Sequence, residues 1–196
     1  YEEVKAGLKE NYGIETLNSF GFNNTYVLAV TRETAEQYGL EKVSDLVSVA
    51  GQLRLGCSPE FAVREDGLPG IEAMYGLKFK STHNFSGTLM YTAITSGEVD
   101  VITAFSTDGL LQKYDLVLLE DDKQFFPEYY GTILARNDLF ERFREEAPDL
   151  EETLSSLNGL FTNDLMSSMT YEVDVEQRSV DDVAREFLIE QGLLAQ

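Results

Sequence analysis

The chain has 196 residues, enough for one large domain or two small ones, and its 43% hydrophobic content supports a buried core rather than bulk disorder. Its 15 basic and 35 acidic residues give a net charge of −20, which argues against binding to nucleic acid or to an anionic membrane, because phosphate binding requires a basic face. The single cysteine, Cys57, excludes a disulfide within the chain and is expected to be a small buried residue.

The first two thirds of the chain show alternating strand and helix patterns. A helix is predicted over 2–11, and strands over 14–20 and 26–30 are joined by a predicted turn at 21–24. Further on, helices are predicted over 31–38, 43–50, 70–75 and 87–96, and strands over 53–57, 77–80 and 99–105. Ser44 and Ser86 are expected to cap the second and fourth of these helices. This alternation is typical of an α/β sheet with parallel character.

After Arg136 the pattern becomes mostly helical. Helices are predicted over 138–146, 148–157, 162–170 and 180–191, and Ser179 with Asp182 resembles a capping box at the start of the last one. The chain is therefore expected to form an α/β lobe over 25–127 and a second unit from 1–24 together with 128–196. Because the chain crosses between these units twice, a hinge is predicted, as in bilobal proteins that close on a ligand.

Three segments carry a resemblance to a known family. They are GFNNTYVLAV at 21–30, SPEFAVREDGLPG at 58–70 and ITAFSTDGLLQKYDLVLLEDDKQFFPEYYGTILAR at 102–136. Over nearly its whole length the chain resembles the substrate-binding proteins of ABC importers for glycine betaine, choline and carnitine. The resemblance implies an α/β fold of the type II periplasmic-binding-protein kind, with two lobes and a hinge. It also implies a receptor without enzymatic activity or cofactor, which binds a small trimethylammonium ligand and delivers it to ABC permease subunits.

The resemblance also implies an aromatic cage. A trimethylammonium group cannot donate a hydrogen bond, so aromatic ring faces and carbonyl or carboxylate oxygens are the groups that favour it. The family pattern assigns cage positions to Tyr26, Phe105 and Tyr129, and at Phe105 it usually has a tyrosine. Tyr130 is the alternative to Tyr129 if the register is shifted by one residue. Packing in the hydrophobic core is the competing interpretation for each ring.

Three polar residues complete the site that the resemblance implies. Arg64 matches an arginine that pairs with the ligand carboxylate, and Glu60 matches an acidic residue that positions this arginine. A surface ion pair of Arg64 with Glu60 or Asp66 is the competing interpretation. Asn24 matches a position whose backbone oxygen faces the cation. No metal site is expected.

Family members carry a sizeable N-terminal segment before the helix with which this chain begins. In the family this segment builds the first sheet of lobe one and supplies another cage tyrosine. We therefore expect lobe one, made of 1–24 and 128–196, to be incomplete, with the chain either a truncated product or completed by another chain through domain swapping or other self-association. We also expect an extracytoplasmic protein that is tethered to the membrane or fused to the permease, with its signal or anchor not in this chain.

Two other functions stay open at this point. A ligand-sensing effector domain on the same fold would accompany a DNA-binding helix pair, and no basic recognition helix is evident in the sequence. An enzyme such as a dehydratase or deaminase would need an acid/base pair, and His83, the only histidine, lies outside every motif. Choline, glycine betaine, carnitine and proline betaine are alternative ligands.

Overall fold

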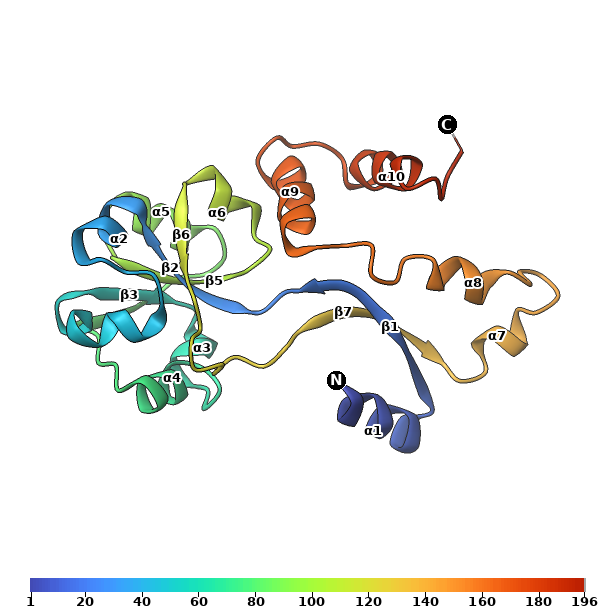
Figure 1. The fold of residues 1–196 in the computed structure, drawn as a ribbon, viewed down its shortest axis with the longest axis horizontal. Helices are drawn as coiled ribbons and strands as arrows, with labels where there is room; N and C mark the ends of the chain where they lie inside the picture. Colours follow the sequence, from blue (N-terminus) through green and yellow to red (C-terminus); the bar gives the residue numbers. More distant parts are fainter. Residues whose placement is uncertain (196) are drawn as a thin grey trace.

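The computed structural model describes residues 1–195, which form two sheets of different size. The larger sheet has five strands in the order β4-β3-β5-β2-β6. These strands are β2 (Tyr26–Thr31), β3 (Arg54–Cys57), β4 (Ser81–Asn84), β5 (Val101–Phe105) and β6 (Leu116–Leu119). A separate antiparallel ribbon is formed by β1 (Ile14–Asn23) and β7 (Tyr130–Arg136), and it extends away from the larger sheet (Figure 1).

The five-stranded sheet is mixed. β3 runs parallel to β4 and β5, whereas β2 runs antiparallel to β5 and β6. The register places Tyr26, the first residue of β2, beside Phe105, the last residue of β5. The amino end of β2 therefore lies at the same sheet edge as the carboxyl ends of β3 and β5. This is the edge at which the chain enters from the ribbon.

Hydrophobic residues are buried on both faces of this sheet. Along β2, Leu28 and Val30 pack in one core cluster and Ala29 packs in the other, as expected from the alternation of side chains along a strand. The first cluster includes residues of α2 (Arg32–Tyr38), η1 (Val43–Ser48), η2 (Ala50–Gln52), α3 (Pro59–Val63) and α4 (Leu68–Tyr75). The second includes residues of α5 (Leu89–Thr95) and α6 (Gly109–Lys113). Burial on both faces explains why the central strands β2 and β5 are continuous apolar runs.

The remaining helices accompany the ribbon. They are α1 (Glu2–Tyr12), α7 (Leu139–Arg142), α8 (Leu150–Ser155), α9 (Asn163–Asp174) and α10 (Val180–Glu190). The last helix begins as predicted, because the Ser179 side chain accepts a hydrogen bond from the backbone nitrogen of Asp182. No helix within residues 1–195 is long and apolar enough to cross a membrane.

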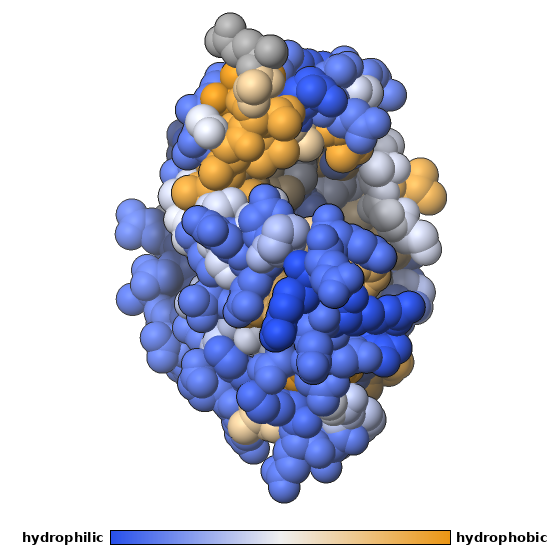
Figure 2. Space-filling model, turned by 90° about the vertical axis from the view of Figure 1, so that its right-hand side faces the viewer, coloured by the Kyte–Doolittle hydropathy of each residue, from blue (hydrophilic) through white to orange (hydrophobic). Residues whose placement is uncertain are grey.

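The ribbon side of the molecule has little buried core of its own. Among its helices, α1, α7, α8 and α9 bury no residue fully, and α10 buries only Val183 and Phe187. An apolar groove of about 420 Å³ lies between α9 and α10. Figure 2 shows apolar surface gathered at the top, where the C-terminal part of the chain lies, above a mostly hydrophilic surface. The hydrophobic core is therefore concentrated around the five-stranded sheet.

Several local predictions were wrong. The turn expected at 21–24 is not one, because β1 continues to Asn23 and β2 begins at Tyr26 in the other sheet. The strand expected over 77–80 lies at 81–84. Neither Ser44 nor Ser86 provides the expected side-chain cap, and Ser44 instead donates to the Asp122 carboxylate over 2.7 Å.

Candidate ligand-binding site

The chain crosses between the two sheets in two segments that lie side by side. The Asn24 backbone nitrogen donates to the Tyr129 carbonyl over 3.0 Å, and the Tyr129 nitrogen donates to Asn23 Oδ1 over 2.6 Å. Thr25 Oγ1 donates to the Pro127 carbonyl over 3.1 Å. These bonds tie the segment leading into β2 to the segment that leads out to β7.

Neighbouring elements fix the first crossing further. Ser106 Oγ donates to the Asn23 carbonyl over 2.7 Å, and Asn163 at the start of α9 exchanges two hydrogen bonds with the Asn23 backbone. Thr107 Oγ1 donates to Asn24 Oδ1 over 2.7 Å. The side-chain oxygen of Asn24 is thus engaged within the protein, which is compatible with a ligand role for its backbone oxygen alone.

Two of the three predicted cage rings are in contact. The ring centroids of Tyr26 and Phe105 lie 4.6 Å apart, because these residues are register partners in β2 and β5. Behind Tyr26 lie two further rings, with centroid distances of 5.1 Å to Phe61 and 5.9 Å to Phe126. Phe61 is buried in the core, whereas Phe105 is 39% exposed. Tyr26 is therefore supported from within the lobe, and the Phe105 side of the pair faces outward.

The aromatic segment behind Tyr26 is anchored on α4. The Phe126 nitrogen donates to Asp121 Oδ2 over 2.8 Å, and the Tyr75 hydroxyl donates to the other oxygen of the same carboxylate. Burial and the Asp121 carboxylate raise the pKa of Tyr75, so its hydroxyl stays protonated as a donor. A Cβ atom at Gly70 would lie 2.7 Å from the Phe125 ring, so α4 and this segment approach closely.

Tyr129 and Arg64 lie at the outer edge of the cluster. Tyr129, in the second crossing, is 42% exposed. Burial raises the pKa of Tyr26. The positive charge of Arg64 opposes this rise, whereas Tyr129 adds to it, so Arg64 and Tyr129 both lie within electrostatic reach of the Tyr26 hydroxyl. The pKa of Arg64 is raised, chiefly by its hydrogen bond to Asp66, so the guanidinium stays charged.

The partner of Arg64 is Asp66 and not Glu60. Arg64 Nε lies 2.8 Å from Asp66 Oδ1, and Arg64 Nη2 pairs with the second oxygen of that carboxylate. Glu60 contacts Arg64 through its backbone, accepting a hydrogen bond of 3.1 Å from the Arg64 nitrogen within α3. The surface ion pair with Asp66 is therefore the one observed, and a positioning role for Glu60 stays a prediction.

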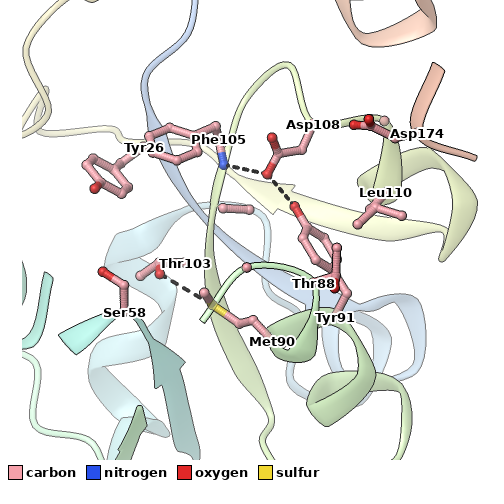
Figure 3. A pocket seen from close by; sticks show the side chains of 13 residues that line it. Tyr26, Ser58, Thr88, Met90, Tyr91, Thr103, Phe105, Asp108, Leu110 and Asp174 are labelled. Carbon is pink, nitrogen blue, oxygen red and sulfur yellow. Dashed lines mark hydrogen bonds between the residues drawn. The ribbon is translucent and has the colours of Figure 1, made fainter. Parts of the chain in front are cut away.

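A cavity of about 310 Å³ opens beside Tyr26 and Phe105 (Figure 3). Its other lining residues are Ser58, Gly87, Thr88, Met90, Tyr91, Thr103, Ala104, Asp108, Gly109, Leu110 and Asp174. The cavity lies at the carboxyl ends of β3 and β5, the edge at which open α/β sheets bind ligands. Because Asp174 belongs to α9, both the large sheet and the ribbon side contribute to it.

Sequence reasoning missed one pair in this cavity. The Tyr91 hydroxyl donates to Asp108 Oδ2 over 2.5 Å, and the Phe105 nitrogen donates to the same oxygen over 3.2 Å (Figure 3). The position of Asp108 directly after a buried strand was the available signal, since side chains at strand ends face the ligand edge. Burial and Asp108 raise the pKa of Tyr91, so the hydroxyl stays a donor.

The histidine of the chain does not line this cavity. His83 lies in β4, where its Nε2 is 2.9 Å from Ser81 Oγ. Within residues 1–195, no group of three or more His, Cys, Asp or Glu side chains could hold a metal ion.

Comparisons with known proteins identify the family. Residues 1–190 match the model of the OpuAC family, described as the substrate binding domain of the ABC-type glycine betaine transport system. The carnitine transport binding protein OpuCC of Listeria monocytogenes is 36% identical over 186 residues, which are 94% of this chain and 59% of that protein. A glycine-betaine-binding protein of Pseudomonas aeruginosa is 34% identical over 205 residues, covering 99% of this chain and 64% of that protein. The chain thus spans less than two thirds of the length of these relatives.

A third relative combines two functions in its name. The ergothioneine transport permease/ergothioneine binding protein EgtU of Helicobacter pylori is 32% identical over 193 residues, which are 98% of this chain and 34% of that protein. This chain therefore matches only one part of that longer protein.

Solved structures agree with this assignment. The crystal structure of a glycine betaine/carnitine/choline ABC transporter superimposes with a TM-score of 0.84 at 36% identity, covering 96% of this chain and 68% of that one. Lactococcal OpuAC in its closed form with glycine betaine gives a TM-score of 0.61 at 20% identity, which shows a shared fold. The predicted α/β fold of the type II periplasmic-binding-protein kind is confirmed. The chain belongs to the OpuAC family of substrate-binding domains of ABC-type glycine betaine transport systems, which are binding proteins and not enzymes.

Proposed function

We propose that this chain binds a quaternary-ammonium osmoprotectant, such as glycine betaine, choline or carnitine, in an aromatic cage between two lobes. The observation that carries this proposal is the contact of Tyr26 with Phe105 beside a cavity at the carboxyl end of β5. Each well-placed ring face contributes about 0.5–2 kcal/mol to binding a cation, so a cage of three rings contributes about 1.5–6 kcal/mol. Tyr129 is the third ring, from the second crossing.

The proposed lobes are 25–127 and the combination of 1–24 with 128–196. They meet at the two crossings, and Asp174 of α9 brings the second lobe to the cavity. In the structure Phe105 and Tyr129 are substantially exposed. Closure about the crossings would bury both rings around the ligand and exclude water, which strengthens their attraction for a cation.

Polar groups orient the ligand in this proposal. The backbone oxygen of Asn24 faces the trimethylammonium group, and Glu60 adds negative potential near Tyr26, whose pKa it helps to raise. Arg64 pairs with the ligand carboxylate when there is one, and to do so it gives up part of its ion pair with Asp66.

The domain is proposed to act outside the cytoplasm and to deliver its ligand to ABC permease subunits. The family description and the names of the relatives support this role. A tether to the membrane and fusion to the permease are both consistent with it, and the name of EgtU offers an example in which permease and binding protein are named together.

The test is calorimetric titration of choline and glycine betaine into the protein that carries this chain. We expect saturable binding of at least one ligand, and a weakening of about tenfold or more in Tyr26→Ala, from the loss of one ring face and of the packing around it. Tyr12→Ala is the control, because Tyr12 is exposed on α1. Folded protein that binds neither ligand, or equal affinity in Tyr26→Ala, would overturn the proposal.

A further inference from the structure

The cavity beside Tyr26 and Phe105 is acidic. Two of its lining residues carry a negative charge, Asp108 and Asp174, and among the lining residues described in the structure none is lysine or arginine. Carboxylates and aromatic ring faces both attract cations, so the lining favours one sign of charge throughout.

Asp108 is held in a fixed position within this cavity. Its Oδ2 accepts from the Tyr91 hydroxyl and from the Phe105 nitrogen, and Tyr91 is only 5% exposed. Asp108 follows Phe105, a proposed cage residue, by three positions, and the hydrogen bond to the Phe105 nitrogen holds its carboxylate at the same end of β5. Phe105 and Asp108 line the same cavity, so a ligand whose cation lies against the Phe105 ring shares this cavity with the Asp108 carboxylate.

Asp174 is brought to the cavity by a close contact between α6 and α9. A Cβ atom at Gly109 would overlap the backbone of Tyr171, so only glycine allows this approach. Thr170 Oγ1 also donates to the Thr107 carbonyl over 2.6 Å. The carboxylate of Asp174 is exposed, and it faces the cavity from the ribbon side.

Arg64, a basic residue within electrostatic reach of Tyr26, already has a carboxylate partner. Arg64 does not line the cavity, and one edge of its guanidinium, formed by Nε and Nη2, is engaged by Asp66. A ligand carboxylate in the cavity would therefore face Asp108 and Asp174, and to pair with Arg64 it would have to share the guanidinium with Asp66. A ligand hydroxyl meets neither penalty and can donate a hydrogen bond to a carboxylate.

We propose that Asp108, assisted by Asp174, makes this site select quaternary-ammonium cations with a neutral hydroxyl end over zwitterions with a carboxylate end. This inference rests on the proposed function and narrows its ligand class. Choline and glycine betaine are matched probes, because they share the trimethylammonium group and differ in whether the other end is a hydroxymethyl or a carboxylate group.

The experiment is titration of both probes into wild-type protein and into Asp108→Asn, Asp174→Asn and Glu98→Gln. We expect wild-type protein to bind choline at least about tenfold more tightly than glycine betaine, and Asp108→Asn to reduce this ratio by about fivefold or more. A smaller reduction is expected for Asp174→Asn. Glu98→Gln is the matched control, because it removes one negative charge from an exposed side chain before the opposite end of β5.

The outcomes separate this inference from the proposed function. If wild-type protein prefers glycine betaine, or if neither aspartate variant lowers the ratio more than Glu98→Gln does, the selectivity role is wrong while the receptor function stands. If wild-type protein binds neither probe, the proposed function fails first. If Asp108→Asn loses the near-UV circular dichroism signal of a packed core, its binding data do not report on selectivity. The result for Asp174→Asn then decides whether the inference holds, because the Asp174 side chain is exposed and its replacement leaves the core intact.

Discussion

Tyr26 shows how a single residue is prepared for a cation. The ring is packed against Phe61 and Phe126 on the lobe side and against Phe105 at the sheet edge. A ring that is already fixed loses little conformational freedom when a ligand binds, so more of the interaction energy appears as affinity. The same packing would be expected of an ordinary core residue, and it is the adjacent cavity that distinguishes this position.

At position 105, where the family usually has a tyrosine, we expect ligand affinity to depend on the aromatic ring face and not on a hydroxyl group. We predict that Phe105→Leu weakens choline binding by about 2- to 30-fold, which corresponds to the 0.5–2 kcal/mol contributed by one ring face. Phe105→Tyr keeps the face and should bind within about twofold of wild-type protein. Calorimetric titration of the three proteins checks this. Equal weakening in both variants would show that shape at this position, and not the ring face, controls binding.

Cys57 provides a residue-scale prediction that does not involve the ligand. The sequence predicted a small buried residue, and the side chain is fully buried at the end of β3, where burial raises the thiol pKa from 9.0 to about 11. The unfolded chain therefore loses its thiol proton first as pH rises, so the free energy of unfolding should fall between about pH 9 and 11. Urea unfolding across this range measures the fall.

The control for this prediction is Cys57→Ala. The variant has no thiol to ionise, so its free energy of unfolding should fall less over the same pH interval, after its lower starting stability is subtracted. Parallel curves for the two proteins would mean that the thiol does not contribute.

At the scale of elements, α4 controls the placement of the aromatic segment behind the cage. Gly70→Ala would set a methyl group 2.7 Å from the Phe125 ring and overlapping the Glu65 carbonyl. We predict a loss of about 1–3 kcal/mol in the free energy of unfolding, typical of overpacking, together with weaker choline binding because Phe126 packs on Tyr26. Chemical unfolding and titration check the two effects.

Gly7→Ala is the matched control for this helix substitution. The new methyl group meets only the Asn11 side chain, 3.9 Å away, and α1 lies outside the site. Replacing a helical glycine by alanine should leave stability unchanged or raise it by up to about 1 kcal/mol, with unchanged ligand binding. Unaltered binding in Gly70→Ala would mean that the aromatic segment tolerates the shift of α4.

The elements also show what the sequence could and could not predict. Apolar runs identified β2 and β5, and with them Tyr26 and Phe105, because burial on both faces leaves a continuous signal in the sequence. Strand direction leaves no such signal, so the antiparallel insertion of β2 was not predicted. The bond between Tyr91 and Asp108 joins α5 to the loop after β5, and only the packing of α5 against the sheet brings the two side chains together.

The resemblance to the family extended the prediction beyond what residue patterns could supply. It gave the positions of Tyr129 and Arg64, which no local pattern marks, and the structure places both near Tyr26. It did not give the partner of Arg64, because two carboxylates lie within reach in sequence and the backbone after α3 decides between them in favour of Asp66. The lobe boundaries and the incompleteness of lobe one stay predictions.

At the scale of the whole molecule, stability should be distributed unevenly. Both core clusters belong to the five-stranded sheet and its helices, whereas the ribbon of β1 and β7 carries helices with few buried residues. Amide groups in segments with little buried apolar surface exchange through local opening, at a lower free energy than global unfolding requires.

We predict that amides of β2 and β5 exchange at least about a hundredfold more slowly than those of β1 and β7, a difference of about 2.8 kcal/mol in opening free energy. Hydrogen exchange read by mass spectrometry measures this directly, with the exposed helix α1 as the fast-exchanging internal reference. Equal protection of the ribbon and the sheet would mean that the whole molecule opens as one cooperative unit, and the two crossings would then be rigid connections and not a hinge.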